Sequence, residues 1–233
     1  MSIAANLERI RNEIADACAR AHRSPSTVAL MAVSKMHPAD AILEAHAAGQ
    51  HLFGENRVQE WQSKQPAVSA ANLEMHLIGP LQNNKTTKAA ELFHAVDTLD
   101  SLKTAERLDR AAAALNKTLP ILIEVKLSPE DTKHGLPPEE LPTLLAQLAP
   151  LNHLIVRGLM TVPPWCEPED AETARPYFAH LRRLRDELQP RHPALTELSM
   201  GMTNDFRVAI EEGSTTVRIG TAIFGKRIYP TPI

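Results

Sequence analysis

The chain of 233 residues is 43% hydrophobic and 23% charged, as in an ordinary globular protein that buries a full core. Its formal net charge is −3, so composition gives no reason to expect binding to nucleic acid or to a membrane surface. Cys18 and Cys166 have no metal-ligand spacing and form no disulfide framework, which is typical of a reduced compartment. Because Glu8, Arg9 and Arg11 lie near the start of the sequence, we expect no signal peptide there, and no apolar run reaches the ~18 residues of a membrane span. We therefore expect a cytoplasmic protein.

Apolar runs of strand length recur along the chain, and each is followed by polar residues or glycine. Such runs indicate short buried strands. The expected strands lie at 28–33, 51–56, 73–78, 93–96, 120–125, 153–156, 195–198 and 215–219. The segments between them carry apolar residues at helical spacing, which predicts amphipathic helices. The expected helices lie at 2–22, 38–48, 57–65, 85–92, 101–115, 139–148, 168–188, 205–213 and 220–224.

The strand-like and helix-like runs alternate from one end of the chain to the other. Strict alternation of this kind favours a parallel sheet. Eight repeats in this length match a single α/β domain over residues 1–233, a (β/α)₈ TIM barrel with an additional N-terminal helix. An open doubly wound sheet is the alternative. No G-x-G-x-x-G follows a strand, which disfavours the dinucleotide-binding form of that alternative.

A lysine ends the first strand-like run, Leu30-Met31-Ala32-Val33-Ser34-Lys35. Burying an unpaired ammonium is costly, so Lys35 either extends into solvent at the strand end or is held there for chemistry. An amine in such a place can have a depressed pKa and attack an aldehyde. In a barrel, the carboxyl ends of the strands carry the active site.

Glycines and hydroxyl groups follow the last two strands. Ser199 and Gly201 follow the seventh strand, and Gly220 and Thr221 follow the eighth. These loops commonly bind phosphate in barrels, because glycine lets backbone N–H groups approach an anion and hydroxyls add donors. Together with Lys35, they predict a site for a phosphorylated aldehyde held as a Schiff base.

Six motifs follow one another in chain order with this arrangement. They are Ala32-Val33-Ser34-Lys35; Phe53-Gly54-Glu55-Asn56 with Val58-Gln59-Glu60; His76-Leu77-Ile78-Gly79-Pro80-Leu81-Gln82 with Asn84-Lys85; Arg157-Gly158-Leu159-Met160; Leu198-Ser199-Met200-Gly201-Met202; and Val217-Arg218-Ile219-Gly220-Thr221-Ala222-Ile223-Phe224-Gly225. On these motifs the sequence resembles the pyridoxal 5′-phosphate (PLP) homeostasis protein family, the YggS/PROSC type. The resemblance implies the barrel of alanine racemase, a PLP fold type III barrel without the C-terminal β-domain.

The resemblance also implies roles for individual residues. Lys35 would form the covalent aldimine with PLP, Arg218 would face the pyridine nitrogen, and Asn56 would lie near the ring. The implied cofactor-binding residues are Lys35, Asn56, His76, Ile78, Met160, Ser199, Gly201, Met202, Arg218, Gly220 and Thr221. The phosphate would contact Ser199, Gly201, Gly220 and Thr221, and the ring face would contact His76, Ile78 and Met160. Thr203 and Phe206 depart from the family pattern, where a serine and a Met or Leu are common.

Several of these residues have a purely structural alternative. Arg218 could form an ion pair at the barrel rim, and Asn56 could be a helix N-cap. Ser199 and Thr221 could hydrogen-bond the local backbone of turns. His76 could be a core histidine whose hydrogen bonds are satisfied inside the barrel.

The resemblance implies a carrier that buffers and delivers PLP without robust turnover. Its expected partners are PLP and apo PLP-dependent enzymes, and we expect a monomer. An amino-acid racemase is the alternative, and it needs a second acid/base across from Lys35. The chain's two tyrosines, Tyr177 and Tyr229, are not placed to supply it. An aldolase-like enzyme is a third possibility, and it lacks an identified acid/base pair. Loop 126–138 is a candidate gate, and we expect no metal.

Overall fold

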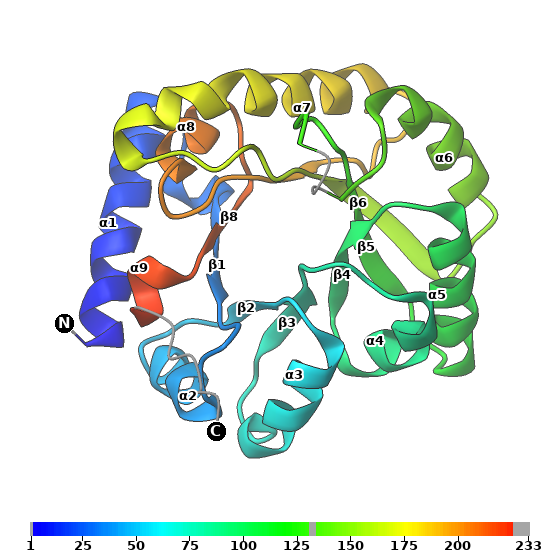
Figure 1. The fold of residues 1–233 in the computed structure, drawn as a ribbon, viewed down its shortest axis with the longest axis horizontal. Coiled ribbons are helices and arrows are strands. Elements are labelled where there is room, and N and C mark those ends of the chain that lie inside the picture. The colour runs from blue at the N-terminus through cyan, green and yellow to red at the C-terminus, as the bar shows by residue number, and fades with distance from the viewer. Residues whose placement is uncertain (1, 131–133, 226–233) are drawn as a thin grey trace.

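Eight parallel strands pair in chain order, and the first also pairs with the last, so the sheet closes into a barrel (Figure 1). The computed structural model describes residues 2–130 and 134–225. The strands are β1 (Ala29–Val33), β2 (Leu52–Glu55), β3 (Glu74–Leu77), β4 (Ala95–Leu99), β5 (Leu119–Glu124), β6 (Leu154–Met160), β7 (Glu197–Ser199) and β8 (Thr216–Ile219). The predicted (β/α)₈ barrel is confirmed.

Helices form a ring outside the strands (Figure 1). They are α1 (Ile3–Arg20), α2 (Ala39–Ala47), α3 (Val58–Lys64), α4 (Thr86–Leu92), α5 (Leu102–Ala114), α6 (Leu141–Leu148), α7 (Arg175–Leu188), α8 (Phe206–Glu211) and α9 (Thr221–Phe224). Within the described ranges, no helix combines the length and the apolar character needed to cross a bilayer.

The main core contains the strands and the apolar faces of these helices. Helix α5, for example, buries Ala105, Leu108 and Ala112 completely, while its charged residues stay at the surface. A different set of buried residues is polar or charged and includes Asp97, Glu124, Ser199 and Arg218. Buried charges need partners, so these residues point to a functional interior.

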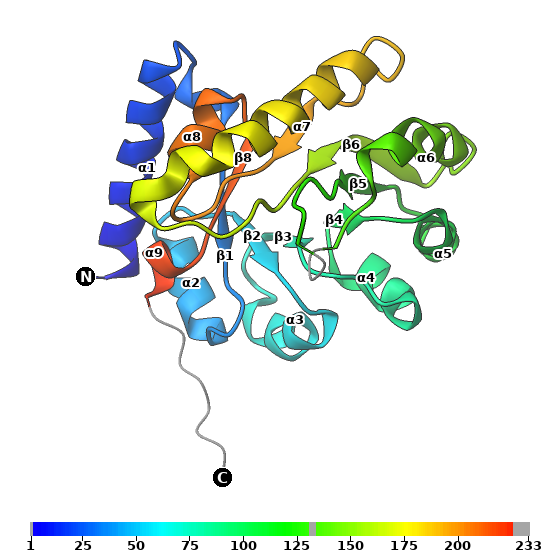
Figure 2. The same cartoon turned by 45° about the horizontal axis from the view of Figure 1, so that its top comes forward.

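The additional N-terminal helix α1 packs against α8 and α9 on the outside of the barrel (Figures 1 and 2). Leu7, Ile10 and Ile14 form its buried face. Asn6 Nδ2 donates to the carbonyl of Ile223 at 2.9 Å, and Arg9 Nη2 donates to the carbonyl of Ala222 at 3.1 Å. These bonds hold the short helix α9 at the end of β8, so α1 helps to position the loop that carries Thr221.

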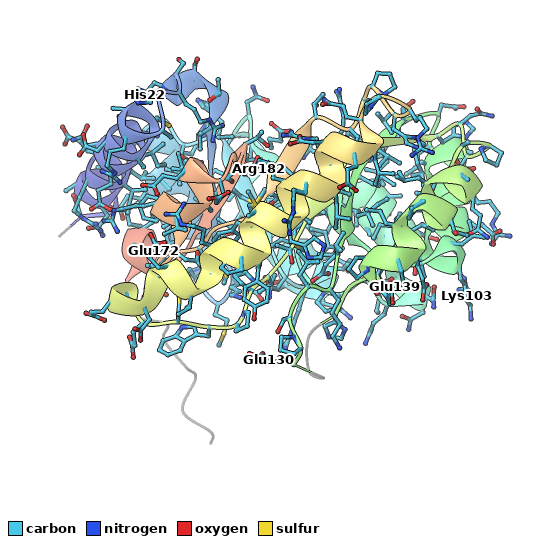
Figure 3. The ribbon with its side chains drawn as sticks, turned by 90° about the horizontal axis from the view of Figure 1, so that it is seen from above. His22, Lys103, Glu130, Glu139, Glu172 and Arg182 are labelled. Carbon is cyan, nitrogen blue, oxygen red and sulfur yellow. The ribbon has the colours of Figure 1, made fainter. Side chains whose placement is uncertain are left out.

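The predicted helix 168–188 begins with a different conformation. Residues Pro168–Ala174 form a 3₁₀ segment, and the α-helix begins only at Arg175. Pro176 has no N–H to donate to the carbonyl four residues earlier, so a regular α-helical ladder cannot run through this position. Figure 3 labels Glu172 and Arg182 along this segment, where Arg182 pairs with Glu212 at 3.1 Å.

Two predicted strands end too early. Strand β4 covers Ala95–Leu99 instead of 93–96, and β6 continues to Met160 instead of ending at 156. Gly158 suggests a strand end in the sequence, because glycine weakens strands. In the structure it lies within β6, where a Cβ would come within 2.0 Å of the Glu197 carbonyl oxygen. Glycine is needed there for the close approach of β7.

Candidate functional site

A cavity of about 280 Å³ opens at the carboxyl ends of the strands. Figure 3 shows the molecule with Glu130 and His22 labelled at its lower and upper edges. Glu130 follows the carboxyl end of β5, and His22 follows the end of α1. The predicted site residues that line this cavity are Lys35, Asn56, Ile78, Met202, Arg218, Gly220 and Thr221. The cavity is near the lower end of the size range of small-molecule sites.

Lys35 lies in the turn that follows β1 and is partly buried. The backbone pairing with β2 continues one residue past the strand, since Ser34 N–H donates to the Gly54 carbonyl at 3.1 Å. The turn then closes with a bond from His37 N–H to the Ser34 carbonyl at 3.1 Å. This geometry carries Lys35 from the end of β1 to the cavity wall.

Arg218 comes from β8 and is only 5% exposed. Its Nη1 donates to Ser199 Oγ at 2.8 Å, and its Nη2 donates to the Thr161 carbonyl at 2.9 Å. In the described part of the chain, its Nε has no hydrogen-bond partner. Burial lowers the pKa of this guanidinium, and the carboxylates of Asp97, Glu124 and Asp205 oppose that change. Arg218 therefore lines the cavity as a cation fixed by two hydrogen bonds.

Ser199, Gly201 and Met160 are not among the residues that line the cavity, so their contact with the cofactor stays a prediction. Ser199 is fully buried and accepts the bond from Arg218. Gly201 has a φ of +95°, and a Cβ there would lie 2.6 Å from the Ala209 Cβ. Met160 is 1% exposed and pairs in register with Ser199. Met160 and Ser199 are the last residues of β6 and β7, and Gly201 follows β7, so these residues lie at the strand ends next to the cavity wall without lining it.

Two loops supply the polar wall next to Lys35. The loop after β7 is closed by Met202 N–H, which donates to Asp205 Oδ1 at 2.6 Å. Met202 and Thr203 line the cavity there. The end of β8 supplies Gly220 and Thr221, the residues at the start of α9. The first N–H groups of a helix have no intrahelical partner, so they and the Thr221 hydroxyl can donate to an anion.

Asn56 and Ile78 line the cavity and directly follow β2 and β3. The N-cap of α3 is Arg57, so Asn56 is not the helix cap that the sequence also allowed. A Cβ on Gly79 would lie 2.3 Å from the Asn56 carbonyl oxygen. Glycine at this position lets the two loops pack tightly and holds Asn56 at the cavity.

His76 does not line this cavity, and its contact with the ring stays a prediction. It lines a second cavity of about 310 Å³, together with the first residues of several strands, including Glu74 and Glu197. Side chains on one strand face repeat every two residues, so His76 sits below Ile78 and deeper in the barrel. Its Nδ1 lies 3.1 Å from Asp97, and its Nε2 lies 3.1 Å from Glu74. The core alternative for His76 is the one that the structure supports.

Burial by itself lowers the pKa of His76. The charge of Asp97 and hydrogen bonds with Asp97 and Glu74 outweigh this and raise the pKa to about 10. The ring is therefore a cation at neutral pH, paired with Asp97 beneath the cavity that holds Arg218.

The sequence interpretation missed Glu124 and His134, which both line the cavity. Glu124 is 7% exposed and ends β5, where a carboxylate within an otherwise apolar run is the available signal. His134 lies in loop 126–138, whose residues 131–133 are outside the described residues. The suggestion that this loop is a gate remains a prediction.

The closed parallel barrel and this cavity define a (β/α)₈ protein with a lysine-bearing small-molecule site at its carboxyl mouth. Residues 5–228 match the family described as alanine racemase, N-terminal domain. A pyridoxal phosphate homeostasis protein of Aquifex aeolicus is 43% identical, over 98% of this chain and 100% of that protein. The one of Pseudomonas aeruginosa is 45% identical, over 99% and 98%. The chain belongs to the alanine racemase N-terminal domain family and, within it, to the pyridoxal phosphate homeostasis proteins.

Solved structures agree with this assignment. PipY of Synechococcus elongatus, determined with PLP bound, has a TM-score of 0.85 and 42% identity, and the match covers 96% of this chain and 100% of PipY. An alanine racemase of Clostridium difficile has a TM-score of 0.72 at 15% identity, over 99% of this chain and 57% of that one. The second similarity shows the fold alone.

Proposed function

We propose that this protein binds PLP as a Schiff base on Lys35 and acts in PLP homeostasis by holding and delivering the cofactor. One observation carries the proposal: Lys35, Arg218 and Thr221 line a single cavity at the carboxyl mouth of the barrel. The name of the relatives and the PLP bound to PipY support it.

The residues present fit this cofactor. PLP supplies, when bound, an aldehyde that condenses with amines. Lys35 supplies the amine, and the backbone and hydroxyl donors at Gly220, Thr221 and Thr203 suit a phosphate. The unused Nε–H of Arg218 suits a neutral ring nitrogen that accepts a hydrogen bond. Ser199 and Gly201 act indirectly, by holding Arg218 and the loop after β7 in place.

Arg218 also limits the chemistry that the site supports. A guanidinium is a permanent donor, so it disfavours protonation of a nitrogen that accepts its hydrogen bond. A carboxylate at that place would instead accept a hydrogen bond from the ring nitrogen and favour its protonated form. The site is therefore suited to retaining PLP and exchanging it between amines more than to stabilising carbanions.

An amino-acid-converting enzyme is the second candidate, because Glu124 and His134 line the same cavity as Lys35. Either could exchange protons with a bound ligand. Incubating the PLP-loaded protein with single amino acids, and assaying racemisation and transamination, separates the two functions. The carrier proposal predicts no sustained turnover. A rate of ~1 per second or more, lost in Glu124→Gln or His134→Asn, would establish the enzyme.

We further propose that the protein is a cytoplasmic monomer that passes PLP to apo PLP-dependent enzymes. The small number of exposed large apolar residues supports a monomer: among the described residues they are Met36, Leu43, Leu115, Ile155 and Trp165. Sedimentation measures the mass, and mixing the loaded protein with an apo enzyme tests delivery. Recovery of that enzyme's activity faster than PLP dissociates into buffer would demonstrate transfer. Equal rates would contradict it.

A further inference from the structure

Three side chains that do not line the cavity hold the backbone around Lys35. They are Glu55 at the end of β2 and Glu60 and Lys64 on α3, and we call them the α3 clamp. Lys64 Nζ lies 2.7 Å from Glu55 Oε1 and 2.7 Å from Glu60 Oε1. It also donates to the Ser34 carbonyl at 3.0 Å. One ammonium thus joins both carboxylates to the backbone of the residue before Lys35.

The clamp forms hydrogen bonds with the residues on both sides of Lys35. On the preceding side, Ser34 Oγ donates to Glu55 Oε1 at 2.8 Å, in addition to the bond from Lys64 to the Ser34 carbonyl. On the following side, Met36 N–H donates to Glu60 Oε1. Because Glu60 and Lys64 are one helical turn apart, both contacts come from the same face of α3. The position of α3 therefore sets the position of the Lys35 backbone.

The turn needs such contacts because its conformation is unfavourable. Met36 has a φ of 63°, in the left-handed region that non-glycine residues rarely adopt. Its side chain is 38% exposed, so burial of that side chain gives little compensation. The hydrogen bonds of the clamp hold this conformation in place together with the bond from His37 N–H to the Ser34 carbonyl.

The clamp is also buried deeply enough to be rigid. Glu55 has a fully buried side chain, and that of Lys64 is 11% exposed. Burial raises the pKa of Glu55, and the charge of Lys64 opposes this. The Glu55 Oε2 atom is buried and has no hydrogen-bond partner among the residues that the structure describes. A buried ionic cluster is often no more stabilising than apolar packing, so stability alone does not explain its presence beside Lys35.

We propose that Lys64 is a positioning residue for Lys35: by joining Ser34, Glu55 and Glu60 it directs the Lys35 amine into the cavity. This inference rests on the proposed function, in which Lys35 binds PLP. It makes Lys64 important for cofactor affinity although Lys64 does not line the cavity.

The test compares PLP binding to Lys64→Met with binding to the wild type and to Lys88→Met. Lys88 forms an exposed ion pair with Glu91, three residues along on α4, so it controls for loss of a helical lysine. We expect the dissociation constant for PLP to rise about tenfold or more in Lys64→Met, since small misplacements of a reacting group have large effects. Lys88→Met should bind like the wild type.

A second variant separates positioning from charge and folding. Lys64→Met alone leaves Glu55 buried without its cation, whereas Glu55→Gln/Lys64→Met keeps one net negative charge in the clamp, as in the wild type. The midpoint temperature of thermal unfolding should return toward the wild-type value in the double variant. We expect weak PLP binding to persist in it, because Ser34 and Met36 remain loosely held.

The amine itself provides a readout that does not depend on PLP. Cofactor-free proteins are treated with pyridoxal, which has no phosphate, and with cyanoborohydride, and the labelling rate of Lys35 is measured by mass spectrometry across pH. At high pH, where the amine is neutral, we expect the labelling rate of Lys35 to differ from the wild-type rate in both Lys64 variants. The rate in Lys88→Met should equal the wild-type rate.

Three results have distinct meanings. Wild-type protein that does not bind PLP at Lys35 would overturn the proposed function. Wild-type binding with an unchanged dissociation constant in Lys64→Met would overturn the positioning role alone. Full recovery of affinity and labelling in Glu55→Gln/Lys64→Met would also overturn it, because charge balance would then explain the effect.

Discussion

Arg218 Nη1 donates a hydrogen bond to Ser199 Oγ at 2.8 Å, and only Arg218 of this pair lines the cavity. The serine sits behind the wall and fixes the plane of the guanidinium, while the Thr161 carbonyl fixes the other terminal nitrogen. The two contacts fix the guanidinium of a residue that lines the cavity. The adjacent strands β7 and β8 therefore cooperate to hold one cation at the cavity.

Ser199→Ala should loosen Arg218 without removing it. A buried guanidinium N–H loses its acceptor, which costs about 1–3 kcal/mol in the free energy of unfolding. PLP affinity should fall roughly tenfold, since ~1.4 kcal/mol corresponds to a factor of ten. Denaturant unfolding and PLP titration measure the two effects. Ser69→Ala, at an exposed serine, is the control; equal affinity in both variants would show that Ser199 does not support the site.

Gly201→Ala should destabilise the loop after β7. The new Cβ meets the Ala209 Cβ and must also adopt a φ of +95°, so clash and backbone strain add. We expect a loss of about 2 kcal/mol or more in the free energy of unfolding. Gly49→Ala is the matched control, because Gly49 has a φ of +80° and its nearest contact would be 3.9 Å away. A loss equal to that of the control would mean that packing against α8 is unimportant.

His76 should make stability depend on pH above neutrality. Its pKa rises from 6.5 to about 10 on folding. A group whose pKa is raised on folding stabilises the protein fully below its unfolded pKa and loses that effect as the pH rises through the folded pKa. The stability difference between wild type and His76→Gln, of order 3 kcal/mol at neutral pH, should shrink between pH 6.5 and about 10.

Unfolding at several pH values checks this, with His51→Gln as a control at an exposed histidine. A difference between wild type and His76→Gln that stays constant across this range would show that His76 is not held as a cation by Asp97.

The barrel was predictable because each βα repeat contains an apolar run of strand length followed by apolar residues at helical spacing. The rim positions of Lys35, Gly220 and Thr221 were also predictable, since residues directly after a parallel strand all reach one rim. Arg218 lies within β8, and its role was predicted from the family resemblance. The sequence did not show which of the two cavities a side chain on a given strand face would line. His76 and Ile78 lie on the same face of β3, yet they line cavities at opposite ends of the barrel.

The supporting contacts were harder to predict than the cavity wall. Ser199 and Gly201 look like anion ligands in the sequence, because a hydroxyl and a glycine after β7 suit that role equally well. Only the packing of α8 and the direction of the Arg218 side chain reveal what they contact. Glu124 was missed because a single carboxylate in an apolar run does not show which way it points.

Mapping the covalent attachment of PLP tests the central claim most directly. The protein is loaded with PLP, reduced with borohydride and digested, and the modified lysine is identified by mass spectrometry. Lys35→Met is compared with Lys126→Met, a lysine just after β5 at the same end of the barrel. We predict that the adduct lies on Lys35, that Lys126→Met retains it and that Lys35→Met loses both the adduct and the absorbance of the bound cofactor. A main adduct on another lysine, or unchanged covalent binding in Lys35→Met, would contradict the account.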